Sequence, residues 1–188
     1  LGQLQGAIIG QHFDASGAKV GGEIEIVAAG ASNPHIAALV DGGYAVTWES
    51  GGDIHVQRLD AAGDETGAEA VVDAAAAQQA NVVALENGDF VVTWSDSGTI
   101  LGQRFGAGGT SIGEPFVVSE PGAGANDSYA TAAGLADGGF AVTWTRFAGA
   151  ETDILVRRFD ADGSPREGEF TVNALAGQVG HVDQLSRI

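Results

Sequence analysis

The feature that most constrains this sequence is an internal repeat with a period of 46 to 50 residues. A ten-residue segment that begins with Leu and ends with Trp occurs three times. A second segment, typified by Gln-Arg-Phe-Asp, recurs in the same order relative to the first. The copies of the first segment span 39–48, 85–94 and 135–144, and those of the second span 11–14, 57–60, 103–106 and 157–160. A period of this length is typical of repeat architectures, in which each repeat is one supersecondary unit.

Each repeat has the pattern of four short strands. In the first complete copy these fall near residues 35–39, 44–48, 54–59 and 69–72, with alternating and β-branched residues. An Asp-Gly or Asn-Gly pair separates the first two strands and predicts a type I′ hairpin turn, in which both central residues have positive φ. No segment shows sustained helical periodicity, and residues 74–80 are expected to be a connector between repeats.

Four antiparallel strands per repeat of this length predict an all-β fold, a β-propeller of four-stranded blades. We expect one domain, residues 1–188, with blade repeats at about 8–53, 54–99, 100–153 and 154–188. The sequence starts on the third and fourth strands of one blade and stops after the first strand of another. A four-bladed ring whose last blade is shared by the two ends is therefore the first expectation. The alternatives are a segment of a larger propeller and an open blade array.

Composition restricts the partners of such a fold. The chain has 188 residues, with 25 Asp and Glu against 8 Lys and Arg, a net charge of −17. A surface this negative repels phosphate backbones and anionic lipids, so we expect neither nucleic-acid binding nor membrane insertion. The absence of Cys excludes thiolate metal sites, thiol catalysis and disulfides.

The repeat resembles one found in large secreted bacterial proteins of the RTX type, the haemolysin-like calcium-binding proteins and adhesins. The segments that carry the resemblance are 137–144, 158–163 and 168–173, and degenerate copies cover about 8–188. The resemblance implies export, with a location outside the bacterium or on its cell surface. The family's calcium nonapeptide, Gly-Gly-x-Gly-x-Asp, is absent, and residues 122–127 echo it with two glycines replaced by Ala.

Carboxylates in the turns between third and fourth strands are the candidate calcium ligands. Calcium takes six to eight oxygen ligands, and closely spaced Asp residues before a Gly turn supply several. The candidates are Asp14, Asp60, Asp160 and Asp162. The alternative is that each aspartate caps the backbone of its own turn.

Aromatic side chains and the loops that break the repeat are the candidate ligand-binding residues. Trp48, Trp94 and Trp144 end equivalent strands and would form a sugar-stacking ring if exposed. The alternative is that they wedge neighbouring blades together, each burying about 150–250 Å². The non-repeating loops are 49–53, 95–99, 123–129 and 145–153; in the longest of them Arg146 and Phe147 are the best single candidates.

Two further sets of residues recur in register. His35, Asn81, Thr131 and His181 hold equivalent positions and would ring a central channel, with Asp183 nearby, where they could hold a metal or an anion. Ordered water in a polar channel is the alternative. The recurring glutamates Glu23, Glu69, Glu114 and Glu169 are expected to form ion pairs with Arg58, Arg104, Arg157 or Arg158.

No catalytic motif is present: the sequence lacks a G-x-S-x-G elbow, an H-E-x-x-H pair and a Walker loop. We therefore expect that the chain is not an enzyme. The first expectation is a non-catalytic scaffold, adhesion or interaction module, stabilised by calcium, of a secreted or surface bacterial protein. Its partners would be a polysaccharide, a cell-surface protein or another copy. The second is a lectin-like carbohydrate-binding module of a secreted enzyme or adhesin. A hydrolytic propeller enzyme ranks third.

Overall fold

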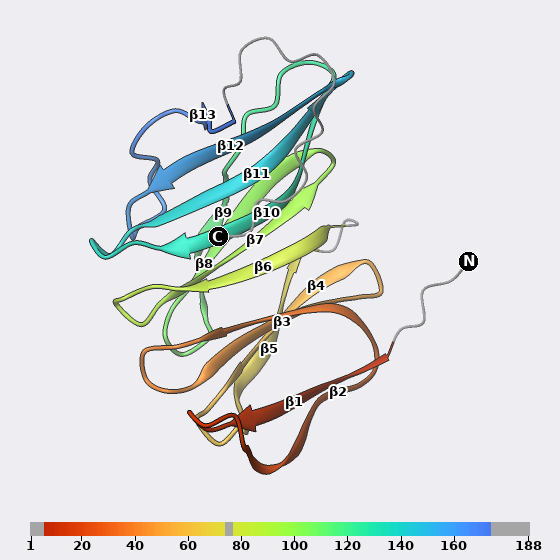
Figure 1. The fold of residues 1–188 in the computed structure, drawn as a ribbon, viewed down its shortest axis with the longest axis vertical. Helices are drawn as coiled ribbons and strands as arrows, with labels where there is room; N and C mark the ends of the chain where they lie inside the picture. The colour runs from red at the N-terminus through yellow and green to blue at the C-terminus, as the bar shows by residue number, and fades with distance from the viewer. Residues whose placement is uncertain (1–5, 74–76, 174–188) are drawn as a thin grey trace.

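The computed structural model describes residues 6–73 and 77–173, and this part of the chain is all β. Its thirteen strands form three antiparallel sheets that follow one another along the longest axis (Figure 1). The first sheet has the order β1-β2-β3-β4-β5, the second β6-β7-β8-β9 and the third β10-β11-β12-β13. The prediction of an all-β fold of four-stranded blades, propeller-like in arrangement, is thus confirmed in its coarse form.

The strand bounds follow the repeat. In the first sheet they are β1 (Gly6–Phe13), β2 (Lys19–Ala38), β3 (Tyr44–Ser50), β4 (Asp53–Leu59) and β5 (Glu65–Asp73). In the second they are β6 (Gln78–Ala84), β7 (Phe90–Asp96), β8 (Thr99–Phe105) and β9 (Ser111–Val117). In the third they are β10 (Ala125–Gly134), β11 (Phe140–Ala148), β12 (Glu151–Phe159) and β13 (Phe170–Thr171).

Strand register repeats along with the sequence. His55 pairs with Val71 between β4 and β5, and Leu101 pairs with Val117 between β8 and β9, a shift of 46 residues in both strands. The same shift in the other direction gives the pair of Ile9 with Glu25 between β1 and β2. Strand β1 and residues 19–27 of β2 are therefore the third and fourth strands of a blade, which we call the half-blade.

The long strand β2 joins the half-blade to the next blade, because its second part pairs with β3. The described residues thus form three four-stranded blades and the half-blade, and no sheet closes on itself. Closure into a four-bladed ring stays a prediction. Residues 174–188, which include the expected fourth copy of the first strand, lie outside the described residues.

The hairpin turns between first and second strands differ from the type I′ turns predicted from the sequence. Only the glycine has positive φ: +86° at Gly42, +92° at Gly88 and +86° at Gly138. The Gly42 amide donates to Leu39 O at 3.0 Å, and the Leu39 amide donates to Gly43 O at 2.8 Å. These bonds define a three-residue loop, a type I turn followed by a left-handed glycine in a G1 bulge. The prediction was wrong because an Asp-Gly pair suits both turns.

The core lies between blades. One buried cluster combines Leu39 and Ala45 of one blade with Phe90, Trp94 and Phe105 of the next. A second combines the equivalent residues Leu85 and Val91 with Phe140, Trp144 and Phe159 of the third blade. Within a blade, paired aromatics stack; the centroids of the Phe90 and Phe105 rings are 5.1 Å apart. Each blade therefore packs residues from its first three strands against the blade that follows it.

The ion pairs differ from those predicted. Three of the four recurring glutamates pair with residues other than the expected arginines. These pairs are Glu23 with Lys19 at 4.0 Å, Glu69 with His55 at 2.6 Å and Glu169 with Arg146 at 2.5 Å. The fourth glutamate, Glu114, is exposed. The four arginines Arg58, Arg104, Arg157 and Arg158 pair with Asp41, Asp89, Glu120 and Glu167, respectively. Two of these acids, Asp41 and Asp89, belong to the tight hairpin turns. The prediction was wrong because strand pairing places the arginines nearer to other carboxylates.

Candidate functional site

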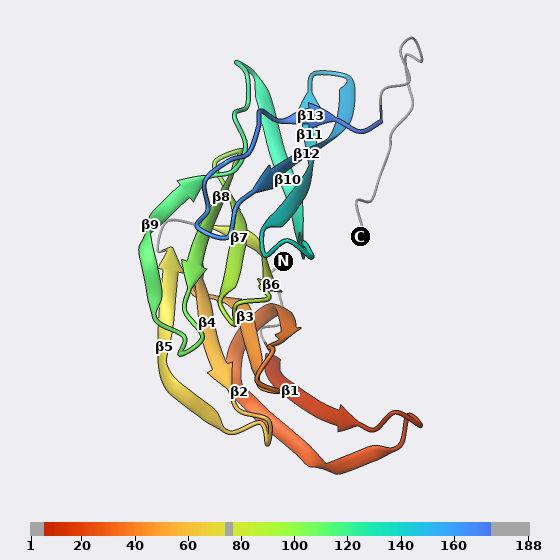
Figure 2. The ribbon, with the colours of Figure 1, turned by 90° about the vertical axis from the view of Figure 1, so that its left-hand side faces the viewer.

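The first strands of the three complete blades lie side by side. The second part of β2 contacts β6, and β6 contacts β10. Figure 2 shows β6 and β10 toward the concave side of the curved molecule, whereas the last strands β5 and β9 follow its convex side. We refer to the second part of β2, β6 and β10 as the inner strands. They are the part of the fold where residues from three blades meet.

Each inner strand contains a bulge at the same repeat position. Asn33, Gln79 and Tyr129 have φ values of 50°, 60° and 58°, and the pairing register shifts at each of them. Left-handed backbone costs a non-glycine residue roughly 1–2 kcal/mol. Backbone strain of this kind clusters at functional sites. Its occurrence three times on neighbouring strands marks this end of the inner strands as a candidate site.

Side chains from one blade fix the bulge of the next. The carboxylate of Glu49 accepts a hydrogen bond from the Gln79 amide N–H at 2.6 Å and one from Asn33 Nδ2 at 2.9 Å. The Gln79 side-chain oxygen in turn accepts a hydrogen bond from the Tyr129 amide N–H at 2.7 Å. These bonds hold the three bulges in a fixed arrangement across three blades.

A second row lies two residues along each inner strand. Asn81 Nδ2 and His35 Nδ1 are 3.4 Å apart, and Asn81 Oδ1 accepts a hydrogen bond from the Ala132 amide at 3.2 Å. Partial desolvation lowers the pKa of His35, and Glu49 only partly offsets this. The structure thus brings together His35, Asn81 and Thr131 of the predicted ring, because the 46-residue and 50-residue spacings put them in register.

The metal proposed for that ring has no further support within the described residues. Across residues 6–73 and 77–173, no group of three or more His, Cys, Asp or Glu side chains is arranged to hold a metal ion. His181 and Asp183, the remaining members of the predicted ring, lie outside the described residues. Metal or anion binding there stays a prediction.

Tyr129 is the exposed aromatic residue of the site. Its side chain is 58% exposed, and its ring meets the half-buried Phe147 edge-on, with 6.3 Å between centroids and an interplanar angle of 70°. Phe147 was predicted as a ligand-binding residue, whereas Tyr129 was predicted only through the non-repeating segment 123–129. The sequence signal for Tyr129 was its place in that segment at the inner-strand position of Asn33 and Gln79.

Arg146 has a structural partner on each side. Its Nε and Nη2 donate to the two oxygens of the buried Asp127 at 2.7 Å each, and its Nη1 donates to Glu169 at 2.5 Å. These hydrogen bonds, with Asp127 first, raise the pKa of Arg146 far above its ordinary value. Arg146 therefore fixes segment 123–129 to β11 and so holds in place the segment that carries Tyr129.

The three tryptophans are almost completely buried between blades. The rings of Trp48, Trp94 and Trp144 have 3%, 1% and 0% of their surface exposed. A buried ring has no free face on which a sugar could stack, so the structure does not support a ligand-binding role for them. They wedge neighbouring blades, which was the alternative interpretation of the sequence.

Three of the four turn aspartates accept hydrogen bonds from their own backbone, and the fourth pairs with a side chain. Asp14 Oδ1 accepts hydrogen bonds from the amides of Ser16 and Ala18, and Asp60 Oδ1 accepts two in the same way. Asp162 accepts one from the Ser164 amide. These three aspartates show the chemistry of Asx turns. Asp160 instead accepts a hydrogen bond from the side-chain Nε of Arg166. Calcium binding at these four carboxylates stays a prediction, which melting curves with calcium and with EDTA would test.

No protein-family model and no curated protein matches the sequence. Among solved structures, the chain is similar to an engineered GH43 glycoside hydrolase with endo-xylanase and exo-arabinofuranosidase activity. That match has a TM-score of 0.49 at 16% identity and covers 78% of this chain and 29% of the enzyme. It is also similar to a mutant of the GH43 protein BlXynB from Bacillus licheniformis. There the TM-score is 0.48 at 12% identity, over 100% of this chain and 45% of that protein.

These comparisons bear on two predictions. Both similar structures are glycoside hydrolases, which contradicts the prediction that the chain is not an enzyme, and we withdraw it. The chain spans less than half the length of either protein. The resemblance to RTX-type proteins, with the secretion that it implies, stays a prediction.

Proposed function

We propose that this chain is a carbohydrate-binding module and that its site is the bulged end of the inner strands. The observation that carries the proposal is Tyr129, an exposed aromatic ring held on a strained backbone by Gln79 and against Phe147. Ligand sites combine such a rigid apolar surface with a few polar groups that set orientation. Strained backbone conformations are common at ligand-binding sites, and here the strained bulge holds an aromatic ring in an exposed position.

The chemistry of the site suits a neutral sugar. A sugar ring has an apolar face that an aromatic ring can cover, and hydroxyl groups that both donate and accept hydrogen bonds. Along the row of bulges that includes Tyr129, Asn33 and Gln79 carry amides and Glu49 carries a carboxylate, which are complementary groups. The net charge of −17 repels anionic ligands but leaves a neutral polysaccharide unaffected.

The wider setting of the module is part of the same proposal. A secreted or cell-surface location would place it beside extracellular polysaccharides, and the resemblance of the repeat to RTX-type proteins supports such a location. Completion of the ring by a fourth blade would enclose the inner strands in a channel, with the bulges at one mouth.

The test is binding of the purified chain to neutral polysaccharides, by affinity electrophoresis and then by calorimetry with the matching oligosaccharide. In the variant Tyr129→Asn the ring is removed while the residue still tolerates left-handed φ. We expect at least one polysaccharide to bind and its affinity to fall about tenfold or more in this variant.

The control is Phe170→Ala, which removes an aromatic ring that is 48% exposed on β13, away from the inner strands. We expect unchanged affinity. A folded wild-type chain that binds no neutral polysaccharide would overturn the proposal, as would equal losses in both variants.

A further inference from the structure

The half-blade has the internal construction of a complete blade. Gln57 Nε2 donates to Arg58 O and Thr66 O, at 2.8 and 3.2 Å, and so joins the third strand to the fourth. Gln11 Nε2 donates in the same way to His12 O and Val20 O, at 3.0 and 3.2 Å. The half-blade is therefore the outer half of a blade, and its inner edge is where a second strand pairs in the other blades.

That edge is unpaired in the described part of the chain, where β1 pairs only with β2. Exposed edges of this kind are commonly protected by Lys, Pro or a bulge that turns the strand away. The sequence of β1, Gly-Ala-Ile-Ile-Gly-Gln-His-Phe, contains no Lys and no Pro. The register shifts in its pairing with β2 place the extra residues in β2 and not in β1. Within the described residues, the other edge of β1 is therefore available to pair with an added strand.

Side chains at this edge are exposed where their repeat equivalents are buried. Phe13 occupies the position of Phe105, and the exposed fractions are 59% and 1%. Ile36, on the inner strand that faces the half-blade, occupies the position of Val82, and the fractions are 61% and 7%. Phe105 owes its burial to stacking with Phe90 of the second strand, a partner that Phe13 lacks within the described residues.

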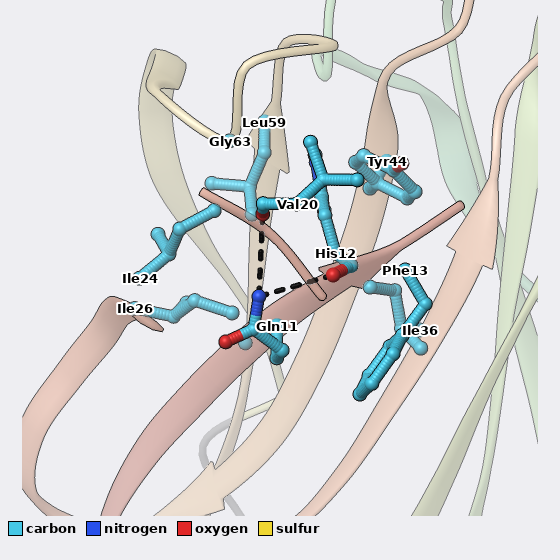
Figure 3. Close-up of a pocket in the computed structure, with 11 residues that line it drawn as sticks. Gln11, His12, Phe13, Val20, Ile24, Ile26, Ile36, Tyr44, Leu59 and Gly63 are labelled. Carbon is cyan, nitrogen blue, oxygen red and sulfur yellow. Dashed lines mark hydrogen bonds between the residues drawn. The ribbon is translucent and has the colours of Figure 1, made fainter. Parts of the chain in front are cut away.

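A pocket of about 280 Å³ lies between the half-blade and the first complete blade (Figure 3). Its walls include Ile24 and Ile26 on one side and Ile36, Tyr44 and Leu59 on the other. In Figure 3 these side chains lie around Gln11, with Ile24 and Ile26 to its left and Tyr44 and Ile36 to its right. The pocket is apolar over most of its lining, which suits an aliphatic side chain.

The next interface along the chain shows what fills this space. There the equivalents of Ile36, Tyr44 and Leu59 pack in one cluster with Leu39 and Ala45, which come from the first and second strands of the preceding blade. The following interface uses Leu85 and Val91 in the same places. Within residues 6–73 and 77–173, the cluster at the half-blade has no counterpart of either residue.

We propose that the edge of β1 and this pocket together bind a β-hairpin with the sequence pattern of the two inner strands of the repeat. Addition of a strand to an exposed edge supplies main-chain hydrogen bonds, and pockets for alternate side chains supply specificity. The pocket takes the leucine that precedes the hairpin turn and the small residue of the second strand.

The register of the complete blades specifies the docked arrangement. In those blades the first residue of the second strand pairs with Leu59, Phe105 or Phe159, which makes Phe13 its partner here. Val46 pairs with Gln57, so the equivalent valine lies opposite Gln11. The expected sequence of the bound hairpin is therefore Leu, a turn that contains Gly, an aromatic residue, a small residue, Val, Thr and Trp.

The experiment uses the complete chain and a synthetic peptide of residues 130–148, the hairpin of the third complete blade. Binding is measured by calorimetry, and hydrogen exchange reports which amides become protected. We expect saturable one-to-one binding with slower exchange in residues 6–13. The peptide variants Leu135→Ser and Phe140→Ser should each bind about tenfold more weakly or worse, since they remove the pocket and stacking side chains.

Protein variants with matched controls locate the site. Phe13→Ser and Ile36→Ser change exposed residues at the edge and should weaken peptide binding about tenfold or more. Val71→Ser and Val117→Ser change residues that are 55% and 52% exposed on outer strands, and should leave it unchanged. No binding of the peptide, binding that the edge variants do not affect, or protection of amides outside residues 6–13 would overturn the proposal.

Discussion

Two phenylalanines at the same repeat position provide a quantitative test of the packing between strands. Phe13 and Phe105 each end the third strand of a unit, and both are followed by the same type of three-residue turn. They differ in burial, with 59% and 1% of their surface exposed. Substitution of each by Ala therefore compares the same chemical change at a half-blade and at a complete blade.

The expected costs differ severalfold. Phe105→Ala removes a ring that stacks on Phe90, with 5.1 Å between centroids and 4° between planes, and leaves a cavity in the core between blades. Deletions of this kind cost about 3–5 kcal/mol. Burial of a whole phenylalanine side chain stabilises the folded state by roughly 1.5–3 kcal/mol. Phe13 buries only roughly two-fifths of its surface, so Phe13→Ala should cost about 1 kcal/mol or less.

Urea denaturation followed by tryptophan fluorescence measures both costs, because the indoles of Trp48, Trp94 and Trp144 are buried and report loss of the interfaces. We expect the midpoint to fall strongly in Phe105→Ala and slightly in Phe13→Ala, with the slope unchanged in both. Equal losses would refute the reasoning, since they would mean that Phe13 is as well packed in solution as Phe105. The same result would remove the basis for an open half-blade.

Two further perturbations test the electrostatics of the site. Arg146→Gln leaves the carboxylate of Asp127 buried without its cation, so the free energy of unfolding should fall by about 3–5 kcal/mol. Arg158→Gln, at an exposed pair, should lower it far less in the same urea titration. His35 has a lowered pKa in the folded chain, so below its ordinary value near 6.5 the unfolded chain binds more protons. Stability should fall as pH drops through that value and level off below the folded pKa; His35→Asn should remove this part of the slope, and an unchanged slope would contradict the assignment.

The fold followed from the sequence mainly through its period. A shift of 46 residues converts the pairing of His55 with Val71 into that of Leu101 with Val117, so recurrence in the sequence became recurrence in register. The turn type did not follow, because an Asp-Gly pair is compatible with both turns and only the observed φ of Gly42 separates them. Local dipeptides thus located the turns without specifying their backbone.

The site was predicted only in part. The row of His35, Asn81 and Thr131 was found because spacing alone aligns residues on neighbouring inner strands. The bulges were missed, since of Asn33, Gln79 and Tyr129 only Asn commonly takes left-handed φ. Their conformation is imposed by contacts between blades, such as the bond from the Gln79 amide to Glu49, which lies 30 residues away in sequence. Tertiary contacts of this kind leave no local pattern in the chain.

Comparison of the three complete blades distinguishes framework positions from those that we propose for ligand binding. At the end of the second strand the backbone position and the side chain both recur, since every copy has a buried tryptophan. At the inner-strand bulge the backbone recurs, but the side chain is Asn33 in one copy, Gln79 in the next and Tyr129 in the third. Buried packing positions also vary between copies, but among apolar side chains, as at Leu59, Phe105 and Phe159. Three different side chains on one strained backbone form an asymmetric surface, which is what discrimination between ligands requires and what a purely structural repeat would not need.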